Sequence, residues 1–117
     1  MAWVVGGRGG GVSENDGFCC NMNAMTPKHR EQYKVLRAKL ESSVDAVYEL
    51  LDGYALRLRA GTFAVAELAA FVVLETRCCP FLTLIMDRKG DSLALRITGR
   101  DGVKDFIRAE FSAIRFE

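Results

Sequence analysis

Two adjacent cysteines, Cys78 and Cys79, stand at the end of an apolar stretch, and Glu75 precedes them by about one helical turn. Residues three and four apart lie on neighbouring positions of one helix face, so the spacing brings a carboxylate close to thiol groups. Thiolates suit soft ions such as zinc, monovalent copper or mercury-like ions, and a carboxylate can complete their coordination shell. The spacing therefore indicates a soft-metal site.

Additional ligands have to come from elsewhere in the chain. Cys19 and Cys20 are the other two sulfurs of the cysteine type, and His29 is the sole histidine. If the first segment docks beside the end of the apolar helix, one of these cysteines supplies a third sulfur. His29 is a more distant candidate, because a histidine in the first turn of a helix is usually solvated.

Two other interpretations of the cysteines stay open. Neighbouring side chains diverge by about 100° on a helix, whereas structural zinc sites usually use Cys-x-x-Cys. A helix C-terminus also carries partial negative charge, which raises the pKa of a thiol. The cysteines could instead be apolar core filler in a dimeric interaction module. They could also be the reactive thiols of a redox or nucleophilic enzyme, but the helix end places them poorly for that unless Arg77, a lysine or a metal compensates. Whether the protein is an enzyme stays undecided at this level.

The composition is that of a single globular domain. The chain has 117 residues, half of them hydrophobic, and 16 basic against 15 acidic residues give a net charge of +1. This balance gives no electrostatic reason to expect a nucleic acid or an anionic membrane as partner. No apolar run approaches the roughly 18 residues of a membrane span, and no secretory signal is visible. A cytoplasmic location with reduced cysteines is the expectation.

The first 16 residues are rich in glycine and predict a flexible arm, followed by one domain over 17–117. A phosphate-binding loop would need Gly-Lys-Ser/Thr after the glycines, and none follows, so no nucleotide cofactor is expected. Residues 18–22 are a short first strand or an irregular lead-in.

A long helix is predicted over 27–51. Thr26 can cap its open N–H groups, and Pro27 has no N–H to leave unbonded. Gly53 after Asp52 would end the helix in a left-handed turn. One apolar stripe at spacings of three and four runs along it: Tyr33, Leu36, Leu40, Val44, Val47 and Leu51. This helix is long for the domain, and its excess apolar surface could support a homodimer.

The remaining elements alternate between strands and helices. Strict alternation predicts a strand over 54–59 with Tyr54, Leu56 and Leu58 facing inward. A buried helix over 63–79 stops before Pro80. Two strands over 81–86 and 93–98 form a hairpin, and Asp101 caps a last helix. The order α-β-α-β-β-α predicts a two-layer α+β domain with helices on one face of a small, mostly antiparallel sheet.

Three segments resemble those of a known group. They are Glu75-Thr76-Arg77-Cys78-Cys79-Pro80-Phe81, the later Thr98-Gly99-Arg100-Asp101-Gly102-Val103-Lys104-Asp105-Phe106, and Cys20 followed by Met25-Thr26-Pro27. The chain is similar over residues 18 to 115 to small uncharacterised bacterial proteins with a Glu-x-x-Cys-Cys-Pro-Phe segment. The resemblance implies a bacterial cytosolic protein and no particular activity.

The resemblance also marks four residues as the ones to test, namely Cys20, Glu75, Cys78 and Cys79. Combined with the chemistry of thiolates and carboxylates, it makes the leading prediction a soft-metal site with three cysteine ligands. Glu75 would either bind the ion directly as a fourth ligand or contact the ligands without touching the ion.

Overall fold

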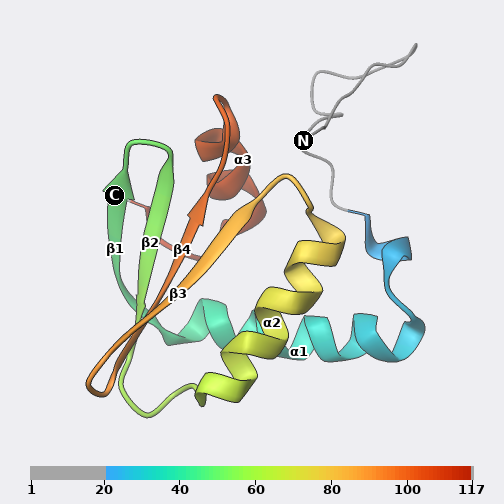
Figure 1. Ribbon diagram of the computed structural model, residues 1–117, viewed down its shortest axis with the longest axis horizontal. Coiled ribbons are helices and arrows are strands. Elements are labelled where there is room, and N and C mark those ends of the chain that lie inside the picture. Colours follow the sequence, from blue (N-terminus) through green and yellow to red (C-terminus); the bar gives the residue numbers. More distant parts are fainter. Residues whose placement is uncertain (1–20, 117) are drawn as a thin grey trace.

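Residues 21–116 are described by a computed structural model, and they form an open four-stranded antiparallel sheet with three α-helices (Figure 1). The elements in chain order are η2 (Met22–Ala24), α1 (Pro27–Ser43), β1 (Val44–Leu50), β2 (Gly53–Leu58), α2 (Val65–Cys78), β3 (Thr83–Lys89), β4 (Ser92–Thr98) and α3 (Val103–Glu110). The strand order across the sheet is β1-β2-β4-β3. The predicted α+β class and antiparallel sheet are confirmed.

Part of the sequence-based prediction lies outside the described residues. The glycine-rich arm over 1–16 belongs there, as do Cys19 and Cys20. Of the lead-in over 18–22, the described part has no strand, because Asn21 precedes the short 3-10 helix η2. Within residues 21–116, no helix is both long enough and apolar enough to cross a lipid bilayer.

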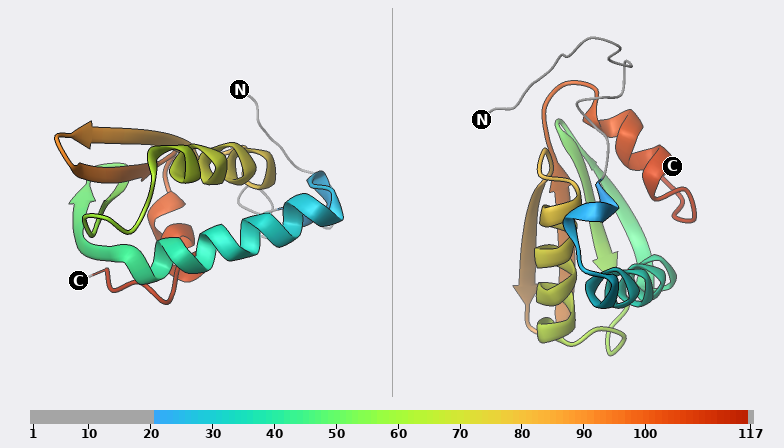
Figure 2. Two further views of the ribbon diagram at one scale, coloured as in Figure 1. Left: turned by 90° about the horizontal axis from the view of Figure 1, so that it is seen from below. Right: turned by 90° about the vertical axis from the view of Figure 1, so that its right-hand side faces the viewer.

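One face of the sheet is buried and the other is exposed. Leu56 on β2 lies opposite Leu95 on β4, and both side chains are fully buried. The predicted inward positions Tyr54, Leu56 and Leu58 are confirmed. Because side chains alternate along a strand, Arg57 lies on the opposite, exposed face. Figure 2 shows α1 and α2 side by side. Their buried side chains pack with those of the sheet in one hydrophobic core.

The helix predicted over 27–51 is wrong beyond Ser43, because Val44–Leu50 is the edge strand β1 and pairs with β2. Leu50 lies opposite Gly53, so only two residues form the hairpin turn. Val44 and Val47 continued the helical spacing, but Leu51 is 97% exposed in that turn. Pairing with β2 therefore outweighed the local pattern, and the long helix on which the predicted homodimer rested does not exist in that form.

Gly53 has a different role from the predicted left-handed helix cap. It opens β2, and its φ angle is not among the positive ones. A Cβ atom at this position would collide with the carbonyl oxygen of Ile97 on β4. Glycine is therefore required here because two strand backbones approach closely.

The buried helix predicted over 63–79 is confirmed as α2 with slightly different ends. Ala64 is its N-cap residue, and its N–H donates to Glu67 Oε1 at 3.0 Å. The helix ends at Cys78, ahead of Pro80 as predicted, and Cys79 is the C-cap residue with φ −129° and ψ 74°, which is neither helical nor fully extended. One face of α2 is buried: Leu68, Phe71, Leu74, Glu75 and Cys78.

Candidate functional site

Glu75 is a charged residue type in the middle of the core. Its side chain is 0% exposed. One carboxylate oxygen, Oε1, accepts a hydrogen bond of 2.6 Å from the hydroxyl of Tyr33 on α1. The other, Oε2, has no hydrogen-bond partner within the part of the chain that the structure describes. Burial raises the pKa of the carboxyl, against the opposing influence of the Tyr33 hydrogen bond.

A chain of hydrogen bonds connects this carboxyl to the surface. The Arg37 guanidinium donates to the Tyr33 hydroxyl at 3.2 Å and to Glu110 Oε2 at 2.6 Å. Arg37 also lies 4.7 Å above the ring centre of Phe111. Burial raises the pKa of Tyr33, and Glu75 raises it further, so Tyr33 stays a hydrogen-bond donor. Three helices therefore contribute to holding Glu75 in one orientation.

Cys78 lies one turn after Glu75 and is a free thiol with 0% exposure. Burial raises its pKa to about 11, and the nearby charges of Glu75 and Glu110 add to the shift. The thiol donates to the thioether sulfur of Met22 on η2, at an Sγ–Sδ distance of 3.6 Å. The Glu75 carboxyl is therefore close enough to Cys78 to affect the charge of its thiol.

Cys79 is in a different state from its neighbour. It is fully buried and disulfide-bonded. Its backbone N–H donates to the Glu75 carbonyl at 2.7 Å and so closes the last turn of α2. The helix end separates the two cysteines as the sequence predicted, with one following the helical face and the other leaving it.

The segment before α1 docks against this helix end. The Asn21 backbone N–H donates to the Cys78 carbonyl at 2.7 Å. Arg30 on α1 donates to the carbonyl oxygens of Met25 at 2.8 Å and Met22 at 3.4 Å, which fixes the segment from the other side. Cys20, which directly precedes Asn21 in the chain, lies outside the described residues. The contact between the first segment and the end of α2 is therefore observed for Asn21, and Cys20 itself is not described.

The other candidate ligand, His29, lies near the end of α2 but not beside the carboxyl. Its Nδ1 is 3.3 Å from Arg77 Nη1. Within residues 21–116, no group of three or more His, Cys, Asp or Glu side chains is arranged to hold a metal ion. The described residues thus contribute Glu75 and Cys78 to the candidate site, while a complete set of the predicted ligands depends on Cys79 in reduced form and on Cys20.

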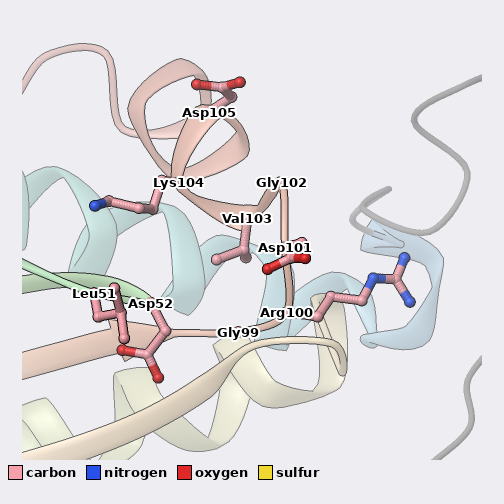
Figure 3. Close-up of a pocket in the computed structure, with 9 residues that line it drawn as sticks. All are labelled: Leu51, Asp52, Gly99, Arg100, Asp101, Gly102, Val103, Lys104 and Asp105. Carbon is pink, nitrogen blue, oxygen red and sulfur yellow. The ribbon is translucent and has the colours of Figure 1, made fainter.

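A separate pocket of about 460 Å³ lies where the turn after β1 meets the loop between β4 and α3 (Figure 3). Its lining residues are Leu51, Asp52, Gly99, Arg100, Asp101, Gly102, Val103, Lys104 and Asp105. Figure 3 shows Arg100 and Lys104 pointing to opposite sides, so these cations do not converge on one anion. Lys104 pairs with Glu49 at 2.5 Å. The side chains of this pocket therefore do not converge on one ligand, and we place the candidate site at the end of α2.

The sequence pattern missed three residues of the candidate site. Tyr33 appeared only as a member of an apolar stripe, and Arg37 as a charge off that stripe. Their spacing of four residues on one helix was the available signal for a joint role. Met22 was not considered, although a thioether is a soft ligand like a thiolate.

Comparisons of the chain with protein-family models, with curated proteins and with solved structures found no match. The resemblance in the Glu-x-x-Cys-Cys-Pro-Phe segment therefore stays a prediction, and the function has to be argued from the site itself.

Proposed function

We propose that the protein binds a soft metal ion at the C-terminal end of α2 through cysteine thiolates. The proposed set comprises Cys20, Cys78 and Cys79 in their reduced forms, with Glu75 as a ligand or as a charge behind the ligands. The observation that carries the proposal is Glu75 Oε2, which is buried beside the Cys78 turn without a hydrogen-bond partner among the described residues.

A buried polar atom without a partner costs about 1–3 kcal/mol, so such an atom calls for an explanation. A bound cation is one explanation, because a cation beside the carboxylate would supply the interaction that Oε2 lacks. The Tyr33 hydrogen bond supports this explanation, since it occupies Oε1 and leaves Oε2 as the available oxygen. Cys78 on the same helix face supplies the sulfur that favours a soft cation.

The docked first segment supports a ligand from outside α2. Asn21, the residue that follows Cys20 in the sequence, donates its backbone N–H to the Cys78 carbonyl. This contact at the end of α2 supports the choice of Cys20 as the third sulfur ligand. Metal binding would release the thiol protons, because thiolates rather than thiols are the ligands, so binding should weaken as the pH falls.

Native mass spectrometry of the fully reduced protein tests this proposal, with zinc and mercuric ions added separately. We expect one bound ion per chain, and loss of binding in Cys78→Ser and Cys20→Ser. Cys19→Ser is the matched control and should bind as the natural chain does. Absence of a bound ion, or undiminished binding in Cys78→Ser, would refute the proposal.

Thiol–disulfide exchange is a second candidate, because Cys79 is disulfide-bonded. In this reaction a partner dithiol would pass two electrons and two protons to the disulfide, which opens to two thiols. Cys78 is a poor nucleophile for such work, since its pKa of about 11 leaves little thiolate at neutral pH. The Cys79 disulfide would thus be the acceptor, and Cys78 a bystander.

Redox titration against glutathione distinguishes the second candidate. A catalytic disulfide is expected to equilibrate within the range of redox enzymes, above about −270 mV, whereas a structural disulfide lies below about −300 mV. Alkylation rates measured against pH give the second readout. A lowered thiol pKa at Cys79 in the reduced protein would support exchange chemistry, and an ordinary or raised value would count against it.

A further inference from the structure

The thiol of Cys78 and the thioether of Met22 lie together at the end of α2, with 3.6 Å between Sγ and Sδ. Metal–sulfur bonds are about 2.3 Å long. One ion bonded to both sulfurs at their present separation would have a sulfur–metal–sulfur angle of roughly 100°, close to tetrahedral. The two sulfurs therefore already have the spacing of ligands to a common ion.

We propose that Met22 is a ligand of this site and that the site takes a monovalent soft cation, cuprous copper, in preference to zinc. This inference rests on the proposed function and names its metal. Thiolate and thioether sulfurs select Cu(I), whereas zinc in proteins is bound by Cys, His, Asp and Glu. A methionine placed against the free thiol of Cys78 thus distinguishes between the two metals.

The existing hydrogen bond marks where the ion would lie. Cys78 now places its proton between the two sulfurs. On binding, the Sγ–H bond breaks, the proton leaves to solvent, and the cation takes its place between Sγ and Sδ. No electron moves, because copper enters and stays as Cu(I). The Met22 thioether is neutral, so it adds a soft sulfur to the thiolate ligands without adding negative charge where burial makes net charge costly.

The position of Met22 depends on backbone contacts rather than on a metal. The Asn21 N–H is bonded to the Cys78 carbonyl, and the Asn21 side chain accepts from the N–H of Asn23 at 3.1 Å. Arg30 binds the Met22 carbonyl from α1. The thioether is therefore held over Cys78 in advance. The buried Oε2 of Glu75, one turn away on α2, has no hydrogen-bond partner among the described residues, so it is an independent polar atom that a cation here could satisfy.

Met22→Leu tests the inference, because leucine keeps the apolar volume and removes the sulfur. The reduced protein is titrated with Cu(I) against a chromogenic chelator, and with zinc in parallel. We expect the variant to bind Cu(I) at least tenfold more weakly and zinc within twofold of the natural chain. Met86→Leu, which removes a partly exposed methionine on β3, is the matched control and should change neither affinity.

A second readout does not depend on the stability of a variant. Methionine labelled with 13C at the methyl group reports each thioether by NMR, and Ag(I) serves as a redox-stable stand-in for Cu(I). One equivalent of Ag(I) should shift the Met22 methyl signal and leave that of Met86 in place. An unmoved Met22 signal in a protein that does bind Ag(I), or equal loss of zinc and Cu(I) in Met22→Leu, would overturn the inference alone. A reduced natural chain that binds neither zinc nor Cu(I) would overturn the proposed function as well.

Discussion

Arg37 and Arg57 are each held by a carboxylate, but in opposite surroundings. Arg37 is 2.6 Å from Glu110, and these side chains are only 20% and 27% exposed. Arg57 is 2.8 Å from Asp45 on the outer sheet face, where the exposed fractions are 46% and 33%. The distances are similar, yet only Arg37 continues inward, through the Tyr33 hydroxyl to the buried Glu75.

The difference shows that the importance of an ion pair depends on which other groups it holds in place, and not on its distance alone. The outer face repeats the arrangement of Arg57 with an Arg96–Asp87 pair at 2.8 Å, and both pairs can exchange their partners for water. Glu75 cannot, because it is fully buried. The network between α1, α2 and α3 therefore maintains a carboxylate where the fold alone would favour an apolar residue.

The largest expected effect on stability separates Arg37→Ala from Arg57→Ala. Losing Arg37 removes the ion pair with Glu110, one hydrogen bond to Tyr33 and the contact with Phe111. We expect a loss of about 3 kcal/mol in the free energy of unfolding, from the cost of stranding partly buried charge. Urea denaturation measures it. Arg57→Ala should shift the midpoint far less, and equal shifts would contradict the contrast.

Tyr33→Phe is the next largest effect and addresses the inner half of the network. The variant keeps the ring, whose centroid lies 5.8 Å from that of Phe71, and removes the hydroxyl that donates to Glu75 and accepts from Arg37. Losing the Tyr33 donor would leave Oε1 as well as Oε2 without a hydrogen bond from the described residues, which should lower the free energy of unfolding by about 1–3 kcal/mol. Tyr48→Phe, on a residue 52% exposed on the sheet, is the matched control and should stay within about 0.5 kcal/mol. Thermal unfolding of the two variants gives the comparison.

The smallest effect is a pH dependence whose sign differs between two glutamates of α2. Burial raises the pKa of Glu75, so its contribution is favourable below the unfolded-state pKa and is lost as the pH rises through the folded-state value. The Ala64 N–H and then Lys39 lower the pKa of Glu67, so its contribution is present at higher pH and is lost on acidification.

Glu75→Gln should therefore gain stability relative to the natural chain as the pH rises from 4 to 8, whereas Glu67→Gln should lose it over the same range. Unfolding midpoints measured at several pH values show the two slopes. The groups that influence the pKa of Glu75 in the fold are the Tyr33 hydroxyl and the charges of Arg37 and Glu110, and neither substitution alters them. Slopes of the same sign would contradict the assigned environments.

Local patterns were sufficient for α2 and for the position of its acidic residue. The apolar run, the stop before Pro80 and the inward face that includes Glu75 all follow from spacing within one helix. The same reasoning was wrong for Val44–Leu50, where the helical spacing continues although the segment is a strand with a register shift between Val44 and Ala46. Only the pairing with β2, a contact between separate elements, decides for the strand.

The partners of the candidate site were beyond the reach of the sequence for the same reason. Tyr33 is 42 residues from Glu75 along the chain, and Met22 is 56 residues from Cys78. Neither separation leaves a periodic signal. Chemistry alone narrows the choice, because a buried carboxylate requires a donor and a soft ion accepts any sulfur, but the identity of each partner depends on how α1 packs on α2.

The short segment that carries Met22 also bears on how fast an ion could reach Cys78. Cys78 has no exposed surface, and η2 is fastened above it by the Asn21 hydrogen bond on one side and by Arg30 on the other. If the proposed ion binds here, it can exchange only when the covering structure opens, and η2 is part of that structure. Exchange would then follow the rate of opening rather than the affinity, which is how a slow-release store behaves.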